Sequence, residues 1–448
     1  MNKTLTTGAV LAALVSVPGF AQQPSSQDRV LRELQALSER VSRLEQKNEL
    51  LEAQNAELQQ KNDRLEATSE YLRANATATR KELAEEGPKV QEAERITKAA
   101  EWASKLTWKG DFRYRHENVD PEEAVTDQDR QRIRARFGLT AKITDAISAT
   151  VQLATGGGNS DPRSTNQTLG SGYDRKQVAI DQAFVDWKFV DGYSLQLGKM
   201  PLPFVRPPDF LWDGDLTPEG GALKIAKGPF FASTFGSWLS ERSTSSDSTL
   251  LGGQVGMTSS LGVTKLTAAA AYFDVGTVEG EVVAMPSGCT TAFNPAFFGG
   301  AQGNTTVTVG GCPLLANDFN MVQLLGMAEF KIGSQPLVLF ADYLQNQEAD
   351  DLDTAYSAGF TFGRASALRS WEIGYAYQVV EKDAQFGQFV DSDFGGGLTD
   401  TEGGVIRVGF VPFAGFVLNG TYFMNKRFVD VGTKRDYTRW QLDLNYRF

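Results

Sequence analysis

The last eleven residues of the chain, Thr438 to Phe448, alternate between apolar and polar side chains. The apolar or aromatic positions are Trp440, Leu442, Leu444, Tyr446 and Phe448. Successive side chains of an extended strand point to opposite faces, so the segment is predicted to form a strand with one apolar and one charged face. Such a strand fits the edge of a soluble β-sandwich as well as the wall of a membrane barrel, and the rest of the chain has to decide between them.

The same period of two recurs from Leu106 onward. Runs bounded by turn residues give about 16 candidate strands. They cover residues 106–117, 130–143, 146–155, 177–190, 193–200, 221–227, 229–239, 249–258, 262–273, 320–332, 336–347, 353–363, 370–381, 403–411, 414–426 and 436–448. Beyond the N-terminal segment no apolar stretch is long enough for a transmembrane helix, so any membrane span has to consist of strands.

The connections between these runs are predicted to alternate strictly in length. Short turns such as Asp191-Gly192 are followed by long polar segments such as 156–176 and 274–319. Short turns at one end and long loops at the other are typical of an outer-membrane barrel, whereas a soluble β fold has no reason to sort its loops in this way. Residues 106–448 are therefore predicted to form an all-β transmembrane antiparallel barrel.

One face of each predicted strand is apolar and is assigned to lipid, and the other is polar and is assigned to the lumen. The lipid side includes Trp108, Phe112, Tyr114, Phe137 and Trp371. A barrel of about 16 strands has a lumen too wide for strand side chains to fill, so we expect a water-filled channel.

The N-terminus has the pattern of a secretory signal over residues 1–21. Lys3 is followed by a short apolar core and by the small-x-small site Gly19-Phe20-Ala21. Disulfides form and persist in exported proteins. Cys289 and Cys312 lie in one polar segment and are therefore predicted to form a disulfide, with two free thiols as the alternative.

Residues 22–72 contain a seven-residue repeat with Leu or Val at position d, which predicts a periplasmic α-helical coiled coil. Position a carries Asn48, Asn55 and Asn62 in successive heptads. Opposite charges flank these positions, so we expect a parallel homo-oligomer. Asparagine at position a favours a dimer, a trimer is the alternative, and the number of subunits stays open. Residues 73–105 are rich in Ala, Glu and Lys and are predicted to be a helical linker.

Four segments resemble the putative porin family of Gram-negative bacteria, in which a coiled coil precedes a porin barrel. They are Lys109 to Arg115, Arg132 to Leu139, Ile180 to Trp187 and Leu197 to Phe204. The resemblance implies an outer-membrane location, passive transport of small solutes or ions, and contact with outer-membrane lipids. The terminal Phe448 resembles the signal that the barrel assembly machinery reads.

Eight arginines on the first, second and last predicted strands occupy the alternate positions that are assigned to the lumen. They are Arg113, Arg115, Arg130, Arg132, Arg134, Arg136, Arg439 and Arg447. If it faced lipid at the midplane of the membrane, each arginine side chain would destabilise the barrel by about 2 to 4 kcal/mol. The first and last strands of a closed barrel are neighbours, so a basic wall that attracts anions is predicted. The alternative is a wall balanced by an acidic loop, without strong ion preference.

An acidic loop follows the fifth predicted strand. The segment 200–220 contains Asp209, Asp213, Asp215 and Glu219, together with five prolines and three aromatic residues. Proline stiffness and aromatic bulk suit a constriction folded into the barrel, and a lid on the surface is the alternative.

Other classes of function find little support. A net charge of −11 argues against a nucleic-acid partner. His116 is the only histidine, no Gly-x-Ser-x-Gly elbow accompanies it, and no metal-ligand spacing is present, so we expect no enzyme, metal or cofactor. The second hypothesis is structural: an anchor whose coiled coil tethers the outer membrane to the cell wall or to a periplasmic partner.

Overall fold

The computed structural model describes residues 38, 58–80, 100–156, 161–207, 210–243, 246–284, 288–289 and 300–448. The chain divides into two units, Met1–Ala100 and Glu101–Phe448, and each is described by itself. The signal segment, Asn48 and Asn55 lie outside the described residues.

The first unit contributes a helix over residues 58–80. The helix continues without a break past residue 72 into the predicted helical linker, and the boundary between coiled coil and linker stays a prediction. Asn62 is exposed, and so are Leu58, Leu65 and Leu72 on the predicted d positions. A coiled coil needs at least two helices, and the described part of the first unit shows one, so the coiled coil stays a prediction. Within the described residues no helix is both long and apolar enough to cross a membrane.

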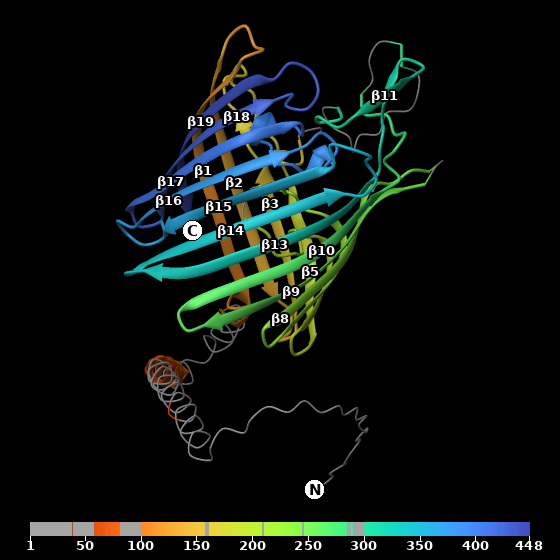
Figure 1. The fold of residues 1–448 in the computed structure, drawn as a ribbon. Helices are drawn as coiled ribbons and strands as arrows, with labels where there is room; N and C mark the ends of the chain where they lie inside the picture. Colours follow the sequence, from red (N-terminus) through yellow and green to blue (C-terminus); the bar gives the residue numbers. More distant parts are fainter. Residues whose placement is uncertain are drawn as a thin grey trace, which may run out of the picture. The chain divides into compact units, whose positions relative to one another are not determined.

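The second unit is a closed antiparallel barrel of 16 strands (Figure 1), in which the first strand pairs with both the second and the last. The strands are β1 Leu106–Pro121, β2 Gln128–Lys142, β3 Ile147–Thr155, β5 Val178–Val190, β6 Tyr193–Lys199, β7 Glu219–Lys227, β8 Phe230–Ser240, β9 Ser248–Leu261, β10 Thr264–Gly276, β13 Phe319–Ile332, β14 Gln335–Asn346, β15 Thr354–Gly363, β16 Trp371–Val380, β17 Thr401–Phe413, β18 Phe416–Arg427 and β19 Arg435–Arg447. The short β4 Gln167–Thr168 pairs with β2 inside a loop. Every predicted run corresponds to one of the sixteen strands.

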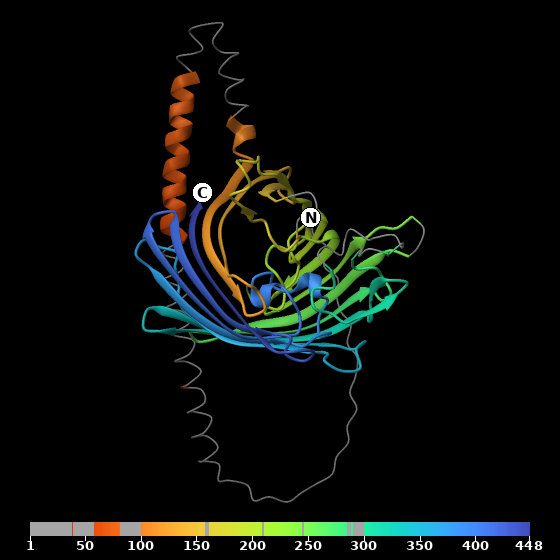
Figure 2. The same cartoon turned by 90° about the horizontal axis from the view of Figure 1, so that it is seen from above.

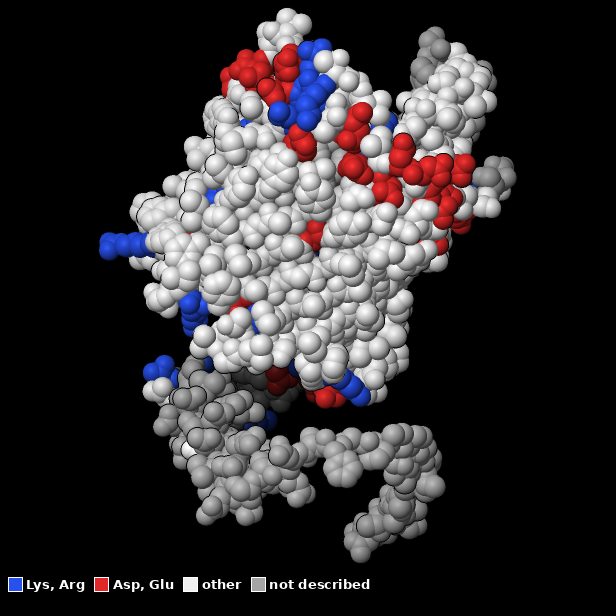
Figure 3. Space-filling view, in the orientation of Figure 1, with Lys and Arg blue, Asp and Glu red and all other residues white. Residues whose placement is uncertain are grey.

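The outward face of the barrel is apolar, as the alternation predicts. Trp108, Phe112, Tyr114, Phe137 and Trp371 are all exposed on it. Figure 3 shows that this surface carries few charges between its two ends. An alternating strand can therefore bury its polar face only toward the interior of the barrel.

Connections at one end, the loop end, are longer on average than those at the other, the turn end. The predicted strict alternation in length is wrong, however. The loop-end connections 122–127, 241–247 and 347–353 are no longer than the turn 364–370 between β15 and β16. The long segments 200–218 and 381–400 pack inside the barrel.

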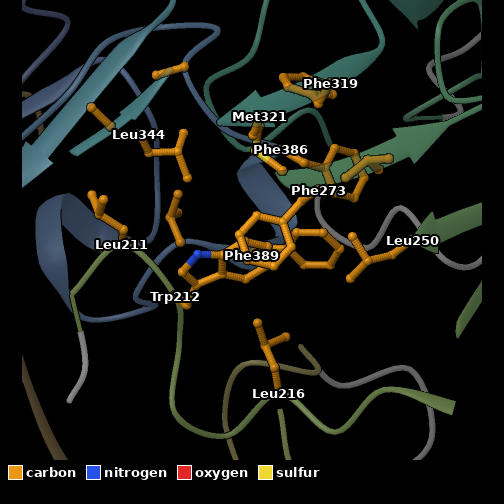
Figure 4. Close-up of a cluster of buried hydrophobic side chains, with 14 of the residues drawn as sticks. Leu211, Trp212, Leu216, Leu250, Phe273, Phe319, Met321, Leu344, Phe386 and Phe389 are labelled. Carbon is orange, nitrogen blue, oxygen red and sulfur yellow. The ribbon is translucent and has the colours of Figure 1, made fainter. Parts of the chain in front are cut away.

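The interior is not polar throughout, which corrects the prediction of a wholly polar lumen. Segments 200–218 and 381–400 fold inside the ring of strands (Figure 2) and cover inward-facing apolar side chains of β9, β10, β13 and β14. We call the resulting cluster the apolar plug (Figure 4); its members include Leu211, Trp212, Leu250, Phe273, Phe319, Met321, Leu344, Phe386 and Phe389. The inward strand positions are apolar here because loop residues, not water, cover them.

The C-terminal residue closes the barrel at the turn end. The N–H of Phe448 donates to the carbonyl of Gly110 (3.1 Å), and the N–H of Gly110 donates to the carbonyl of Phe448 (2.9 Å). A Cβ at position 110 would overlap the Phe448 ring, so only glycine fits there. The role of Phe448 as an assembly signal stays a prediction.

The loop between β10 and β13 contains a hairpin of β11 Thr306–Val309 and β12 Cys312–Leu315. Cys289 and Cys312 form a disulfide with a Cα–Cα distance of 4.8 Å. The bond ties this hairpin to the preceding part of the same loop.

Candidate functional site

All eight predicted arginines lie on three adjacent strands, β1, β2 and β19. Arg113 pairs across the sheet with Arg134, and Arg115 pairs with Arg132. On the other side of β1, Asp111 pairs with Arg447. We call this part of the lumen the arginine wall. Closure of the barrel creates it, because β1 and β19 are the first and last strands of the barrel and meet only when the barrel closes.

Carboxylates on the same strands neutralise most of the arginine wall. Glu117 accepts from Arg130 (2.8 Å), Arg132 (3.4 Å) and Arg439 (2.5 Å), and its side chain is fully buried. Asp111 accepts from Arg134 (2.9 Å) and Arg136 (2.7 Å). Asp443 accepts two hydrogen bonds from Arg115 at 2.7 and 2.8 Å. The wall is therefore a network of ion pairs and not a bare basic surface.

The sequence also contains a signal that places these carboxylates among the arginines. Asp111 and Glu117 have the same odd numbering on β1 as Arg113 and Arg115. Asp443 shares its parity with Arg439 on β19. Side chains two apart on a strand share a face, so the same period that groups the arginines also brings acids among them.

The segment 200–218, between β6 and β7, lies inside the barrel against the wall. Asp215 is 3.5 Å from Arg136 and also accepts from the hydroxyl and the N–H of Thr165. Asp213 accepts from the N–H of Ser392 at 2.9 Å. Burial, the Asp391 carboxylate and Asp215 raise the pKa of Asp213 well above its usual range.

Two residues of the predicted constriction are not part of this arrangement. Asp209 lies outside the described residues. Glu219 belongs to β7, where its exposed side chain pairs with Lys199 at 2.9 Å on the neighbouring strand. Its inclusion in the constriction is wrong, because the loop ends just before it and the sheet determines its direction.

The segment 381–400, between β16 and β17, also enters the lumen; the sequence predicts a long loop at 382–402 but not this path. Asp393 in this segment accepts from Arg115 at 3.0 Å, from Arg439 at 2.8 Å and from Gln441 at 2.8 Å. Burial by itself would raise the pKa of Asp393, but Arg439 and Arg115 outweigh it and hold the pKa far below its usual range. Asp393 therefore stays ionised.

Arg163 holds the segment 381–400 in place from a third loop. Its guanidinium donates to the carbonyls of Gly387 (2.9 Å) and Gly397 (2.8 Å) and pairs with Asp161 (2.7 Å). The residue is only 3% exposed. No pattern in the sequence marks this arginine, because its partners are backbone carbonyls more than two hundred positions away.

Two cavities lie along the arginine wall. The inner cavity has a volume of about 730 Å³ and is lined by eight arginines and six carboxylates. The outer cavity, about 330 Å³, lies between the loop-end halves of β1, β2 and β19. Ser392 and Asp393 line both cavities. These two cavities therefore follow the polar side of the barrel, while the apolar plug packs against the other side.

Asp430 in the segment 428–434 makes a pH-dependent contact with the segment 381–400. Its N–H donates to Asp400 (2.6 Å), and its carboxylate accepts from the N–H of Lys382 (3.1 Å). Burial and the carboxylates of Asp400 and Glu381 raise the pKa of Asp430 to about 6.

We expect this contact to weaken as the pH rises through about 6. The folded pKa is raised, so the contribution of the contact is complete below the ordinary carboxyl pKa and is lost as Asp430 ionises. Hydrogen exchange of residues 428–434 between pH 5 and pH 7, corrected for the intrinsic exchange rate, measures the effect. Asp430→Asn should abolish the pH dependence, and equal protection of the unsubstituted chain at both pH values would contradict the assignment.

His116 lies away from both cavities. It occupies an outward position on β1 and contacts Trp440 edge-on, with ring centroids 4.7 Å apart. Among the described residues, no three His, Cys, Asp or Glu side chains are grouped so as to hold a metal ion.

Comparisons with known proteins agree with this architecture. The sequence matches the family model described as "Putative porin" over residues 118–332 and 315–448. No curated protein matches it. Among solved structures, the high-pH structure of Pseudomonas putida OprB has a TM-score of 0.53 at 12% identity, covering 79% of this chain and 96% of OprB. That likeness shows the fold.

Two further structures have lower scores. A loop-deletion mutant of Vibrio cholerae OmpT has a TM-score of 0.46 at 11% identity, with 77% of this chain and 100% of OmpT covered. The Acinetobacter baumannii outer membrane channel DcaP has a TM-score of 0.46 at 10% identity, with 77% and 97% covered. The family model covers most of the barrel and well over half of the whole sequence. The chain therefore belongs to the Putative porin family of outer-membrane channels.

Proposed function

We propose that the protein is a porin for passive diffusion of small hydrophilic solutes, with a weak preference for anions. The observation that carries the proposal is the pair of polar cavities along the arginine wall, inside a closed barrel. Their volumes suit small solutes. Because the apolar plug packs against the opposite side of the interior, we expect a hydrophilic solute to pass beside the arginines.

The balance of charge supports a weak preference and not a strong one. The eight arginines of the inner cavity face six carboxylates, and the raised pKa of Asp213 lowers the acidic charge further. Arg206 donates to the backbone carbonyls of Pro207 (3.2 Å) and Trp212 (3.1 Å). A small excess of fixed positive charge raises the local concentration of anions without binding them tightly.

An anchor that tethers the outer membrane through its N-terminal helix is the second candidate. The apolar plug favours it, because a structural barrel needs no open lumen. Steady ion conductance in planar bilayers would exclude a purely structural role, and its absence would exclude the porin.

We expect replacement of Arg132 and Arg134 with Ala to shift the reversal potential in a salt gradient toward cations. The change leaves Glu117 and Asp111 with fewer arginine partners. A local potential change of one kT alters the concentration of a monovalent ion by roughly threefold, so a permeability ratio altered by about that factor is expected. Bilayer recordings in a potassium chloride gradient measure it.

The matched control replaces Arg364 and Arg369, in the turn between β15 and β16, with Ala. It removes the same charge outside the cavities and should leave the reversal potential unchanged. An equal shift in both double variants would show that the arginine wall has no special role.

A further inference from the structure

Segment 391–393 separates the two cavities on the polar side of the barrel. Ser392 and Asp393 line both, one face toward the loop end and the other toward the turn end. The N–H of Ser392 is bonded to Asp213 on the segment 200–218. On the route of the proposed porin, a solute that moves from the outer to the inner cavity has to pass this segment.

The Asp393 carboxylate occupies a binding site formed by side chains of the barrel wall. Arg439 donates to Oδ1, whereas Arg115 and Gln441 donate to Oδ2, so each oxygen has its own donor. The three donors come from β1 and β19, which are hydrogen-bonded neighbours. Asp393 itself comes from a loop and forms no part of the sheet. The donors therefore belong to the barrel wall, whereas the carboxylate belongs to a loop segment that Arg163 holds through the carbonyls of Gly387 and Gly397.

The charge count shows that the site cannot stay empty. Five arginines form one ion-pair network with three carboxylates; the arginines are Arg113, Arg115, Arg130, Arg132 and Arg439, and the carboxylates are Glu117, Asp443 and Asp393. Without Asp393 two carboxylates would face five arginines, of which Arg439 is only 3% exposed. Buried charges without partners are costly, so withdrawal of Asp393 requires another anion.

We infer that Arg115, Arg439 and Gln441 form a binding site for the carboxylate group of a permeating organic acid, which Asp393 fills when no solute is present. This inference rests on the proposed porin function and names its solute class. The solute carboxylate replaces the Asp393 carboxylate, so the number of ion pairs is unchanged while the segment 391–393 is released. Because the tethered Asp393 competes at a high effective concentration, solute binding is weak and rapid release is preserved.

Cysteine labelling of the full-length protein tests the exchange. The two native cysteines are joined in a disulfide, so Ser392→Cys introduces a single free thiol. We expect acetate to accelerate its reaction with a small neutral thiol reagent several-fold, and we expect its neutral isostere acetamide to have no effect. In the Ser392→Cys/Asp393→Asn double variant, labelling should already be fast, and acetate should not accelerate it.

Matched variants keep the result interpretable. Asp350→Asn on the segment 347–353 removes the same charge at the loop end and should label like the parent. Gln441→Leu removes one neutral donor from the site without changing its charge, and should also speed labelling even if Asp393→Asn fails to assemble. Acceleration by phosphate equal to that by acetate would overturn the carboxylate assignment, and no response to acetate would overturn the exchange itself.

Conductance separates this inference from the porin proposal. Asp393→Asn should raise the single-channel conductance in chloride, and Asp350→Asn should not. If neither the parent nor Asp393→Asn conducts, the porin proposal fails, while the labelling experiment still reports on the carboxylate site. If the parent and Asp393→Asn have equal conductance and acetate leaves labelling unchanged, the porin proposal stands and the Asp393 inference is wrong.

Discussion

Trp212→Ala is expected to open the lumen and to raise the single-channel conductance several-fold. Trp212 is 1% exposed and lies at the centre of the apolar plug (Figure 4). Its ring contacts Phe204, Phe273 and Phe389 at centroid distances of 5.1, 4.8 and 5.3 Å. It therefore joins the segment 200–218 both to strand β10 and to the segment 381–400.

The loss of this side chain should cost about 3 to 5 kcal/mol in the packing of the two segments against the barrel. The barrel itself should remain, because its strands are held by backbone hydrogen bonds that do not involve Trp212. Single-channel recording measures the conductance, and limited proteolysis of residues 381–400 measures the release of the segment.

Trp238→Ala is the matched control. Trp238 lies on β8, but its side chain faces outward and is 60% exposed. Its replacement should leave both conductance and proteolysis unchanged. An unchanged conductance in Trp212→Ala would show that the plug does not limit the pore.

The second large effect is expected for Arg115→Leu. Arg115 is 5% exposed and pairs with Asp443 (2.7 Å) and Asp393 (3.0 Å), with Glu117 close by (3.9 Å). Its removal leaves these buried carboxylates short of positive charge. Breaking a buried pair in this way typically costs about 3 to 5 kcal/mol. The midpoint of urea unfolding in lipid vesicles should fall accordingly.

A surface arginine and a double variant complete this test. Arg435→Leu breaks an exposed pair with Glu122 (3.6 Å) and should cost no more than about 1 kcal/mol. Arg115→Leu combined with Asp443→Leu removes both partners and should recover part of the lost stability. Equal effects of Arg115→Leu and Arg435→Leu would mean that the network adds nothing beyond a surface pair.

The asymmetry of the interior explains how one barrel can have both a plug and a passage. Inward positions of β9, β10, β13 and β14 are largely apolar and bind the loops through the hydrophobic effect. Inward positions of β1, β2 and β19 are charged, and their side chains line the two cavities. The loops therefore pack against one side and leave the other for solutes.

The strands and their faces follow from the sequence alone. Alternation is a local property: a side chain such as Trp440 points away from its neighbours Arg439 and Gln441 wherever the strand lies. Parity also places Arg115 and Arg132 in the lumen, because charged residues on the lipid side are too costly. Closure then brings the first and last strands together, so even the position of the arginine wall is predictable.

Only the tertiary structure decided what fills the lumen and which charges are balanced. Asp393 meets Arg115 across 278 positions, and Arg163 meets Gly397 across 234. No local period encodes such contacts. Leu344 and Asp342 share the inward face of β14, and only the loops that cover Leu344 account for its full burial. Strand faces depend on backbone geometry, whereas the path of a loop depends on the surface it meets after the barrel has closed.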